Sequence, residues 1–238
     1  AGDLDGNVDN KSGTSNRGTV NLTGTGTVTG ALGTTKSLKS VSAGATGYST
    51  TFDGAINATT VAIGGGSASF AEGITGNVTV NGGSFTLAAG KNISGYIDAL
   101  AGGSSMTFSG SSTIGGLVGS TTAFDLITAG AANSTVTFSS AVKAGTIEVA
   151  SGTVAFSDNA TGDINFTDDG VVQLAAGKTI TGYVDNKTGA DGAGTLTFAG
   201  ASTVTKAIGV TNALKLITAA QGGAAAVFGS SVDAQTIN

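Results

Sequence analysis

The sequence predicts an all-β protein folded as a parallel β-solenoid (β-helix), in which the chain winds in stacked coils around a continuous core. Three observations support this prediction. Short strands recur about every 17–18 residues, glycine is abundant, and proline is absent. The stretch from Thr135 to Asp185 shows the recurrence most clearly.

Two interleaved series of strands mark the coils in this stretch. Apolar and polar residues alternate within each strand, so one row of side chains faces a core and the other faces solvent. At this spacing the whole chain makes roughly thirteen coils. The strands are Thr135–Phe138, Thr153–Phe156 and Val171–Leu174 in the first series, and Thr146–Val149, Asp163–Phe166 and Thr179–Gly182 in the second.

The composition fits a chain that is almost entirely interior to hydrogen-bonded sheets. Proline cannot donate a hydrogen bond to a strand ladder, and this chain contains none. The 41 glycines supply the positive φ angles that tight corners require. A hydrophobic content of 39%, together with the regular strands, argues against a disordered low-complexity chain.

The coils are grouped in a longer sequence repeat of about 86–90 residues. Gly90–Asp98 (GKNISGYID) recurs at a spacing of 87 as Gly177–Asp185 (GKTITGYVD), and Ala123–Thr128 recurs at a spacing of 90 as Ala213–Thr218. We therefore predict a single elongated solenoid over residues 1–238. Its repeat units are 1–89, 90–176 and 177–238, the last of them incomplete. Solenoids need polar caps, and none is visible in the sequence, so we expect further coils or stacked copies at the ends.

Phenylalanine side chains are the predicted structural core. Several of the ten phenylalanines occupy equivalent positions in the repeat units, and all lie in or beside predicted strands. A stack of aromatic rings inside the coils explains this placement better than a ligand-binding aromatic stripe. The predicted core residues are Phe52, Phe70, Phe108, Phe138, Phe156, Phe198 and Phe228.

Two surface patterns offer weaker signals for binding. Tyr96 and Tyr183 occupy equivalent positions in the repeat, but one recurring tyrosine per unit is weak evidence for a sugar-binding surface. Pairs of the form Thr-x-Thr, such as Thr27 and Thr29, resemble the threonine arrays of ice-binding solenoids. These pairs do not recur in every coil, and the valine between them is expected to point inward, so the sequence does not favour ice binding.

The segment from Asp3 to Asp9 is the one stretch that looks like a calcium loop. Its oxygen-bearing residues alternate, but Gly6 lies two places early for an EF-hand loop and no glutamate closes it. The repeat aligns Leu4 and Val8 with Ile93 and Ile97. We therefore interpret the segment as a strand and turn, and predict neither a metal site nor a cofactor.

The densest acidic cluster consists of Asp163, Asp168 and Asp169. Paired carboxylates on a β-helix face can serve polysaccharide hydrolysis. Here, however, Asp-Gly is ordinary turn chemistry, and the chain has no histidine to act as a base. We predict that the protein is not an enzyme and has no catalytic residue, and keep a polysaccharide-degrading β-helix as a remote alternative.

Charge and hydropathy limit the partners. The chain has 10 basic and 15 acidic residues, a net charge of −5, and Arg17 is its single arginine. This balance argues against a nucleic-acid partner. No uninterrupted apolar run is long enough to span a membrane, so we expect no membrane insertion of this segment. The absence of cysteine leaves the redox compartment open.

Two stretches carry a resemblance to a known family. They are Ser105–Thr128 (SMTFSGSSTIGGLVGSTTAFDLIT) and Gly194–Thr218 (GTLTFAGASTVTKAIGVTNALKLIT). Their strand repeats resemble those of bacterial autotransporter passengers, and are most similar to the large rickettsial outer-membrane surface antigens of the A and B type. The resemblance implies a secreted, extracellular protein at the bacterial cell surface that acts in adhesion or as a surface layer.

Two functional hypotheses follow. The first is a structural surface protein whose solenoid assembles, end to end or laterally, into a fibre or surface layer. The second is an adhesin passenger domain that attaches to a host or neighbouring cell. An exposed flat apolar face would favour lateral assembly, whereas long loops on one side would favour adhesion.

Overall fold

The structure, a computed structural model, describes residues 2–219 and 225–238. The predicted fold class is confirmed: the described chain is all-β, and its parallel strands stack as a β-solenoid of about 10 turns. No helix in these ranges is long and apolar enough to cross a membrane. The chain divides into two compact units, Ala1–Asp125 and Leu126–Asn238, and each is described by itself. The predicted division into three repeat units stays a prediction.

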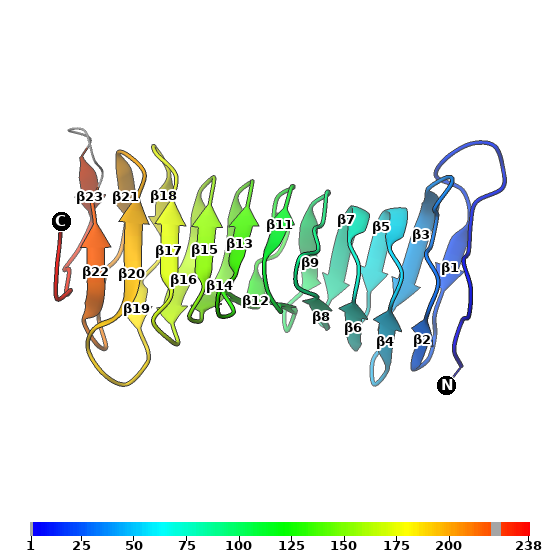
Figure 1. Cartoon of the computed structure of the whole chain (residues 1–238), viewed down its shortest axis with the longest axis horizontal. Coiled ribbons are helices and arrows are strands. Elements are labelled where there is room, and N and C mark those ends of the chain that lie inside the picture. The colour runs from blue at the N-terminus through cyan, green and yellow to red at the C-terminus, as the bar shows by residue number, and fades with distance from the viewer. Residues whose placement is uncertain (1, 220–224) are drawn as a thin grey trace. The chain divides into compact units, whose positions relative to one another are not determined.

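The first unit is built from two stacks of parallel strands (Figure 1). Neighbours within each stack come from successive coils, and strands of the two stacks alternate along the chain. One stack consists of β1 (Thr19–Asn21), β3 (Leu38–Ala43), β5 (Ile56–Ile63), β7 (Ile74–Asn81) and β9 (Ile97–Ala101). The other consists of β2 (Gly26–Val28), β4 (Ser49–Phe52), β6 (Ser67–Phe70), β8 (Ser84–Leu87) and β10 (Ser105–Phe108). They are followed by β11 (Ser112–Ile114), and β12 (Phe124–Ala129) contains the boundary between the units.

The second unit repeats this arrangement. Its first stack consists of β13 (Thr135–Phe138), β15 (Thr153–Phe156), β17 (Val171–Leu174), β20 (Ala193–Phe198) and β22 (Leu214–Thr218). Its second stack consists of β14 (Val142–Val149), β16 (Ala160–Phe166), β18 (Thr179–Thr181), β21 (Ser202–Val204) and β23 (Ala226–Phe228), and β19 (Val184–Asn186) also pairs with β16.

Coil length varies more than the sequence pattern suggests. The predicted short step holds in the middle of each unit, where Phe52 pairs with Phe70 and Thr153 pairs with Val171. Other coils are longer, since Thr179 pairs with Thr203. The longer coils explain why the described residues make about 10 turns rather than the roughly thirteen expected.

A bulge recurs at the same place in both units and depends on glycine. In β5–β7 and in β14–β16 the register shifts by one residue, and Gly76 and Gly162 lie opposite the extra residue. Their φ angles are 138° and 133°. A Cβ atom on either glycine would overlap a carbonyl oxygen of the preceding coil, at Ala58 or Ala144. The bulge therefore requires glycine at both positions.

Most of the predicted core phenylalanines lie inside the coils. Phe52 stacks on Phe70 with ring centroids 5.0 Å apart, and Phe138 stacks on Phe156 at 5.6 Å. Buried within the coils are Phe52, Phe70, Phe108, Phe138, Phe156 and Phe198.

Phe228 differs from this group because it is only half-buried. Its ring meets Phe198 edge-on at 5.9 Å, and among the described residues β23 is the last strand of its stack. One side of Phe228 is therefore covered by the preceding coil. Phe85, Phe124 and Phe166 are also fully buried and join the core without having been predicted there.

The stacking of Phe138 on Phe156 predicts that a charge at position 138 strongly destabilises the fold. Substitution Phe138→Asp places an unpaired carboxylate against Phe156 in a fully buried position, and we expect loss of the native fold. Circular dichroism and thermal melting test this, with Phe228→Asp as the control that should be milder. A native spectrum and an unchanged melting temperature for Phe138→Asp would contradict the inward assignment.

Candidate functional site

The most elaborate polar structure is a corner that occurs once in each unit. Its sequence is Asp-Asn-Lys-Ser/Thr-Gly, at Asp9–Gly13 and at Asp185–Gly189. We call each of these segments a polar corner. Both lie in the longer coils, since Val8 pairs with Leu32 and Val184 with Ile208.

The buried asparagine organises the polar corner of the second unit. Asn186 Nδ2 donates to the carbonyl oxygens of Ala190 at 2.7 Å and Ala213 at 2.9 Å. Its Oδ1 accepts from the backbone N–H of Thr188 at 3.0 Å and from the Thr188 hydroxyl at 2.7 Å. The amide thus closes its own turn and ties it to the next coil.

Asn10 makes the same set of bonds in the first unit. Its Nδ2 donates to the carbonyl oxygens of Thr14 at 2.7 Å and Ser37 at 3.0 Å, and its Oδ1 accepts from the Ser12 N–H and hydroxyl. The third repeat-equivalent position is Ala99, where the coil is three residues shorter and Ile97 pairs with Val118. The asparagine therefore accompanies the longer coil.

The Asp185 side chain is nearly buried, and both of its carboxylate oxygens accept hydrogen bonds. Its side chain is 4% exposed and lies 2.6 Å from Lys187 Nζ. Thr211 donates to it twice, from the backbone N–H at 2.9 Å and from the hydroxyl at 2.7 Å. Burial alone would raise the pKa of Asp185, but the bonds from Lys187 and Thr211 outweigh it and lower the pKa below its ordinary value. Asp185 is therefore an ionised structural acceptor.

Aspartate and asparagine side chains link successive coils elsewhere as well. In each case a side-chain oxygen accepts a hydrogen bond from a backbone N–H of the following coil. These pairs are Asp3 with Thr27 at 2.8 Å, Asn7 with Ala31 at 2.8 Å, Asn92 with Thr113 at 2.8 Å, Asn159 with Thr179 at 2.9 Å and Asp163 with Tyr183 at 3.0 Å. The side chains thereby extend the ladder of backbone hydrogen bonds.

The segment that resembled a calcium loop is one of these linked segments. Asp3 and Asn7 accept from the next coil, as does Asp5 from the Thr29 hydroxyl at 3.3 Å. Leu4 pairs with Val28 as a parallel bridge. Across the ranges that the structure describes, no group of three or more His, Cys, Asp or Glu residues could hold a metal ion.

The three aspartates of the acidic cluster have different partners. Asp163 lies 3.8 Å from Lys206 Nζ, whereas Asp169 pairs with Lys215. Asp168 accepts from the Asp169 N–H at 2.8 Å. Asp163 and Asp185 instead line the same groove. The only sequence signal for this site was the recurring Asp-Asn-Lys motif, which contains Asp185.

This groove, of about 370 Å³, lies in the second unit, and five of its six lining residues carry polar groups. Asp163 and Asn165 come from β16 and Asp185 from β19, strands that are labelled in Figure 1. Tyr183 is 40% exposed there, and Lys206 Nζ lies 4.6 Å from the centre of its ring. The lining residues are Asp163, Asn165, Tyr183, Asp185, Lys187 and Val210.

A hydroxyl face occupies the outward side of β4, β6, β8 and β10. None of these strands contains a Thr-x-Thr pair, but serine and threonine together supply two outward hydroxyls in each strand. The outward residues pair in two columns, and Ser67 donates to Ser49 at 2.8 Å. We define the hydroxyl face as Ser49, Ser67, Ser84 and Ser105 in one column and Thr51, Ser69, Thr86 and Thr107 in the other.

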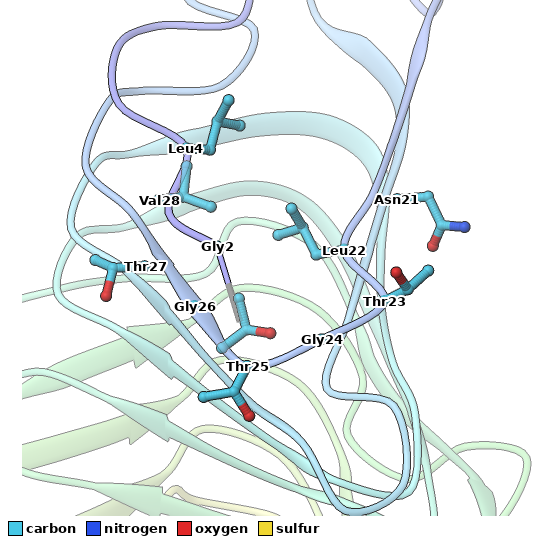
Figure 2. A pocket seen from close by; sticks show the side chains of 11 residues that line it. Gly2, Leu4, Asn21, Leu22, Thr23, Gly24, Thr25, Gly26, Thr27 and Val28 are labelled. Atoms are coloured by element: carbon cyan, nitrogen blue, oxygen red, sulfur yellow. The ribbon is translucent and has the colours of Figure 1, made fainter.

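Another pocket, of about 320 Å³, lies at the first coil of the first unit (Figure 2). The apolar side chains of Leu4, Leu22 and Val28 gather on it, and Thr25 lies on its opposite side. None of the residues that line it, all described, is charged. It therefore offers no acid–base chemistry.

The polar corner makes a prediction about stability. Substitution Asn186→Ala removes a buried amide that bonds to Ala190, Ala213 and Thr188, and we expect the free energy of unfolding to fall by about 1–3 kcal/mol. The control is Asn81→Ala at an exposed position. Denaturant titration measures both, and equal losses would contradict the assigned role.

The lowered pKa values predict a loss of stability in acid. The pKa of Asp9 is lowered mainly by the Thr35 side chain, that of Asp158 mainly by Lys178, and that of Asp185 as described above. Because the folded-state values lie below the unfolded ones, their stabilisation is complete above about pH 5 and is lost as pH falls through the lowered values. Melting temperature against pH tests this, with Asp185→Asn expected to flatten the curve. A melting temperature that stays constant down to about pH 2 would refute it.

Comparison with known proteins agrees with the resemblance seen in the sequence. No family model and no solved structure matches the chain. Outer membrane protein A of Rickettsia rickettsii is 36% identical over 221 residues, which cover 92% of this chain and 8% of that protein. The chain thus spans about a twelfth of this curated relative. Over this stretch the chain, a β-solenoid, is similar to outer membrane protein A of Rickettsia rickettsii, as the resemblance to the A-type surface antigens predicted.

Proposed function

We propose that this chain is a structural, non-enzymatic segment of a cell-surface protein, displayed outside the cell, whose copies associate laterally into a fibre or surface layer. The similarity to an outer membrane protein suggests the surface location. The single observation that carries the structural role is the use of aspartate and asparagine side chains as links between coils. The carboxylates among these links, such as Asp163 and Asp185, act as hydrogen-bond acceptors within the fold.

The hydroxyl face supports lateral association in particular. It presents eight serine and threonine side chains from four neighbouring strands and no charged residue, so it offers hydroxyls in place of the apolar face expected of lateral assembly. Short hydroxyl side chains lose little conformational entropy on contact. A second copy can approach such a surface closely and exchange hydrogen bonds with it.

An adhesin is the second candidate. The groove around Tyr183 favours it, because a concave polar site with an exposed aromatic ring is suited to a ligand. The loop between β19 and β20, residues 187–192, includes part of the polar corner beside this groove. Long loops on one side of a solenoid are common binding elements.

Electron microscopy over a concentration series distinguishes the two. We expect fibres or sheets for the unmodified chain and dispersed particles for Ser69→Lys, which places a charge in the middle of the hydroxyl face. The matched control is Thr75→Lys, at an exposed position on β7 outside this face. Dispersed particles of the unmodified chain at every concentration would contradict assembly and favour the adhesin.

A further inference from the structure

We propose that the groove around Tyr183 in the second unit binds a neutral sugar. Its volume of about 370 Å³ lies at the lower end of the range for ligand pockets. The six residues that line it combine one aromatic ring, one aliphatic side chain, two carboxylates, one amide and one ammonium.

The charges of the groove favour an uncharged ligand. Lys187 Nζ lies 2.6 Å from an oxygen of Asp185, and Lys206 Nζ lies 3.8 Å from Asp163. Each ammonium is thus matched by one carboxylate. Lys206 makes its pair from outside the groove, whose lining holds two carboxylates and one ammonium, so with this pairing neither an anion nor a cation finds an unpaired opposite charge.

The polar groups suit hydroxyls in particular. A sugar hydroxyl both donates and accepts hydrogen bonds, and so needs acceptors and donors close together. Asp163 offers acceptor oxygens, Lys187 offers an ammonium, and the amide of Asn165 offers both kinds of group. Side chains that are already bonded to one another also hold their positions before the ligand arrives.

The apolar groups suit the face of a sugar ring. Tyr183 is 40% exposed and Val210 is 60% exposed, although both are large hydrophobic residues. Lys206 does not line the groove, and its ammonium lies 4.6 Å from the centre of the Tyr183 ring. This contact holds the ring in place from outside the groove. The C–H face of a pyranose can then pack against Tyr183 and Val210.

The first unit contains a natural comparison. Tyr96 is 38% exposed, and its backbone N–H donates to Asn77 at 3.2 Å, as that of Tyr183 does to Asp163. The repeat, however, places Leu100 at the position of Lys187 and Gly116 at that of Lys206. Tyr183 and Asp185 therefore have counterparts in Tyr96 and Asp98, whereas Lys187 and Lys206 are particular to the second unit.

Nuclear magnetic resonance of the full chain tests the proposal, with glucose, galactose, mannose and N-acetylglucosamine as neutral probes. Glucuronate and glucosamine serve as the anionic and cationic counterparts. We expect at least one neutral sugar to shift the backbone amides of Tyr183 and Lys187 with a millimolar dissociation constant, and both charged sugars to bind more weakly.

Variants locate the site. Tyr183→Ala should weaken binding about tenfold, and Val210→Arg should block the groove from a position that is 60% exposed and tolerant of change. Tyr96→Ala should bind like the unmodified chain. The proposal is overturned if no neutral sugar shifts these amides, if a charged sugar binds more tightly, or if Tyr183→Ala and Tyr96→Ala bind alike while both melt normally.

Discussion

In this solenoid the backbone groups of each coil must find hydrogen-bond partners in the neighbouring coils, at the corners as well as along the strands. Regular strands do this with their own N–H and C=O groups, as in β15–β17. At other places an aspartate or asparagine side chain supplies the acceptor for a backbone N–H of the following coil, as Asp3 does for Thr27 of β2 and Asn159 for Thr179 of β18. Many of the few acidic residues act as such acceptors, so their main role is to stabilise the fold.

The same constraint explains why the spacing of the larger repeat drifts along the chain. Where the Asp-Asn-Lys motif is present, the coil has three more residues, and Asn186 absorbs them in a buried hydrogen-bonded turn. Where Ala99 replaces the asparagine, the shorter coil closes without it. Coil length is thus set locally, while Gly76 and Gly162 keep the bulge between coils constant.

The strand period and the inward phenylalanines were predictable because alternation and recurrence are written directly in the sequence. The polar corner was not predicted, since a buried asparagine looks like any loop asparagine until its partners, such as Ala213, are known. The hydroxyl face was missed because only threonine pairs were sought, whereas Ser67 and Thr86 serve the same surface. The groove at Tyr183 could not be predicted without the fold, because Asp163 lies in β16 and Lys187 in the corner that follows β19.

The most direct measurement is native-state hydrogen exchange at amides whose acceptor is a side chain, above all Thr27, Thr113, Thr179 and Thr211. If side chains carry the ladder between coils, these amides exchange as slowly as those within β15 and β17, and Asp185→Ala speeds exchange at Thr211 without affecting Thr27. Rapid exchange at all four amides in a chain whose strands remain protected would contradict this view of how the solenoid is held together.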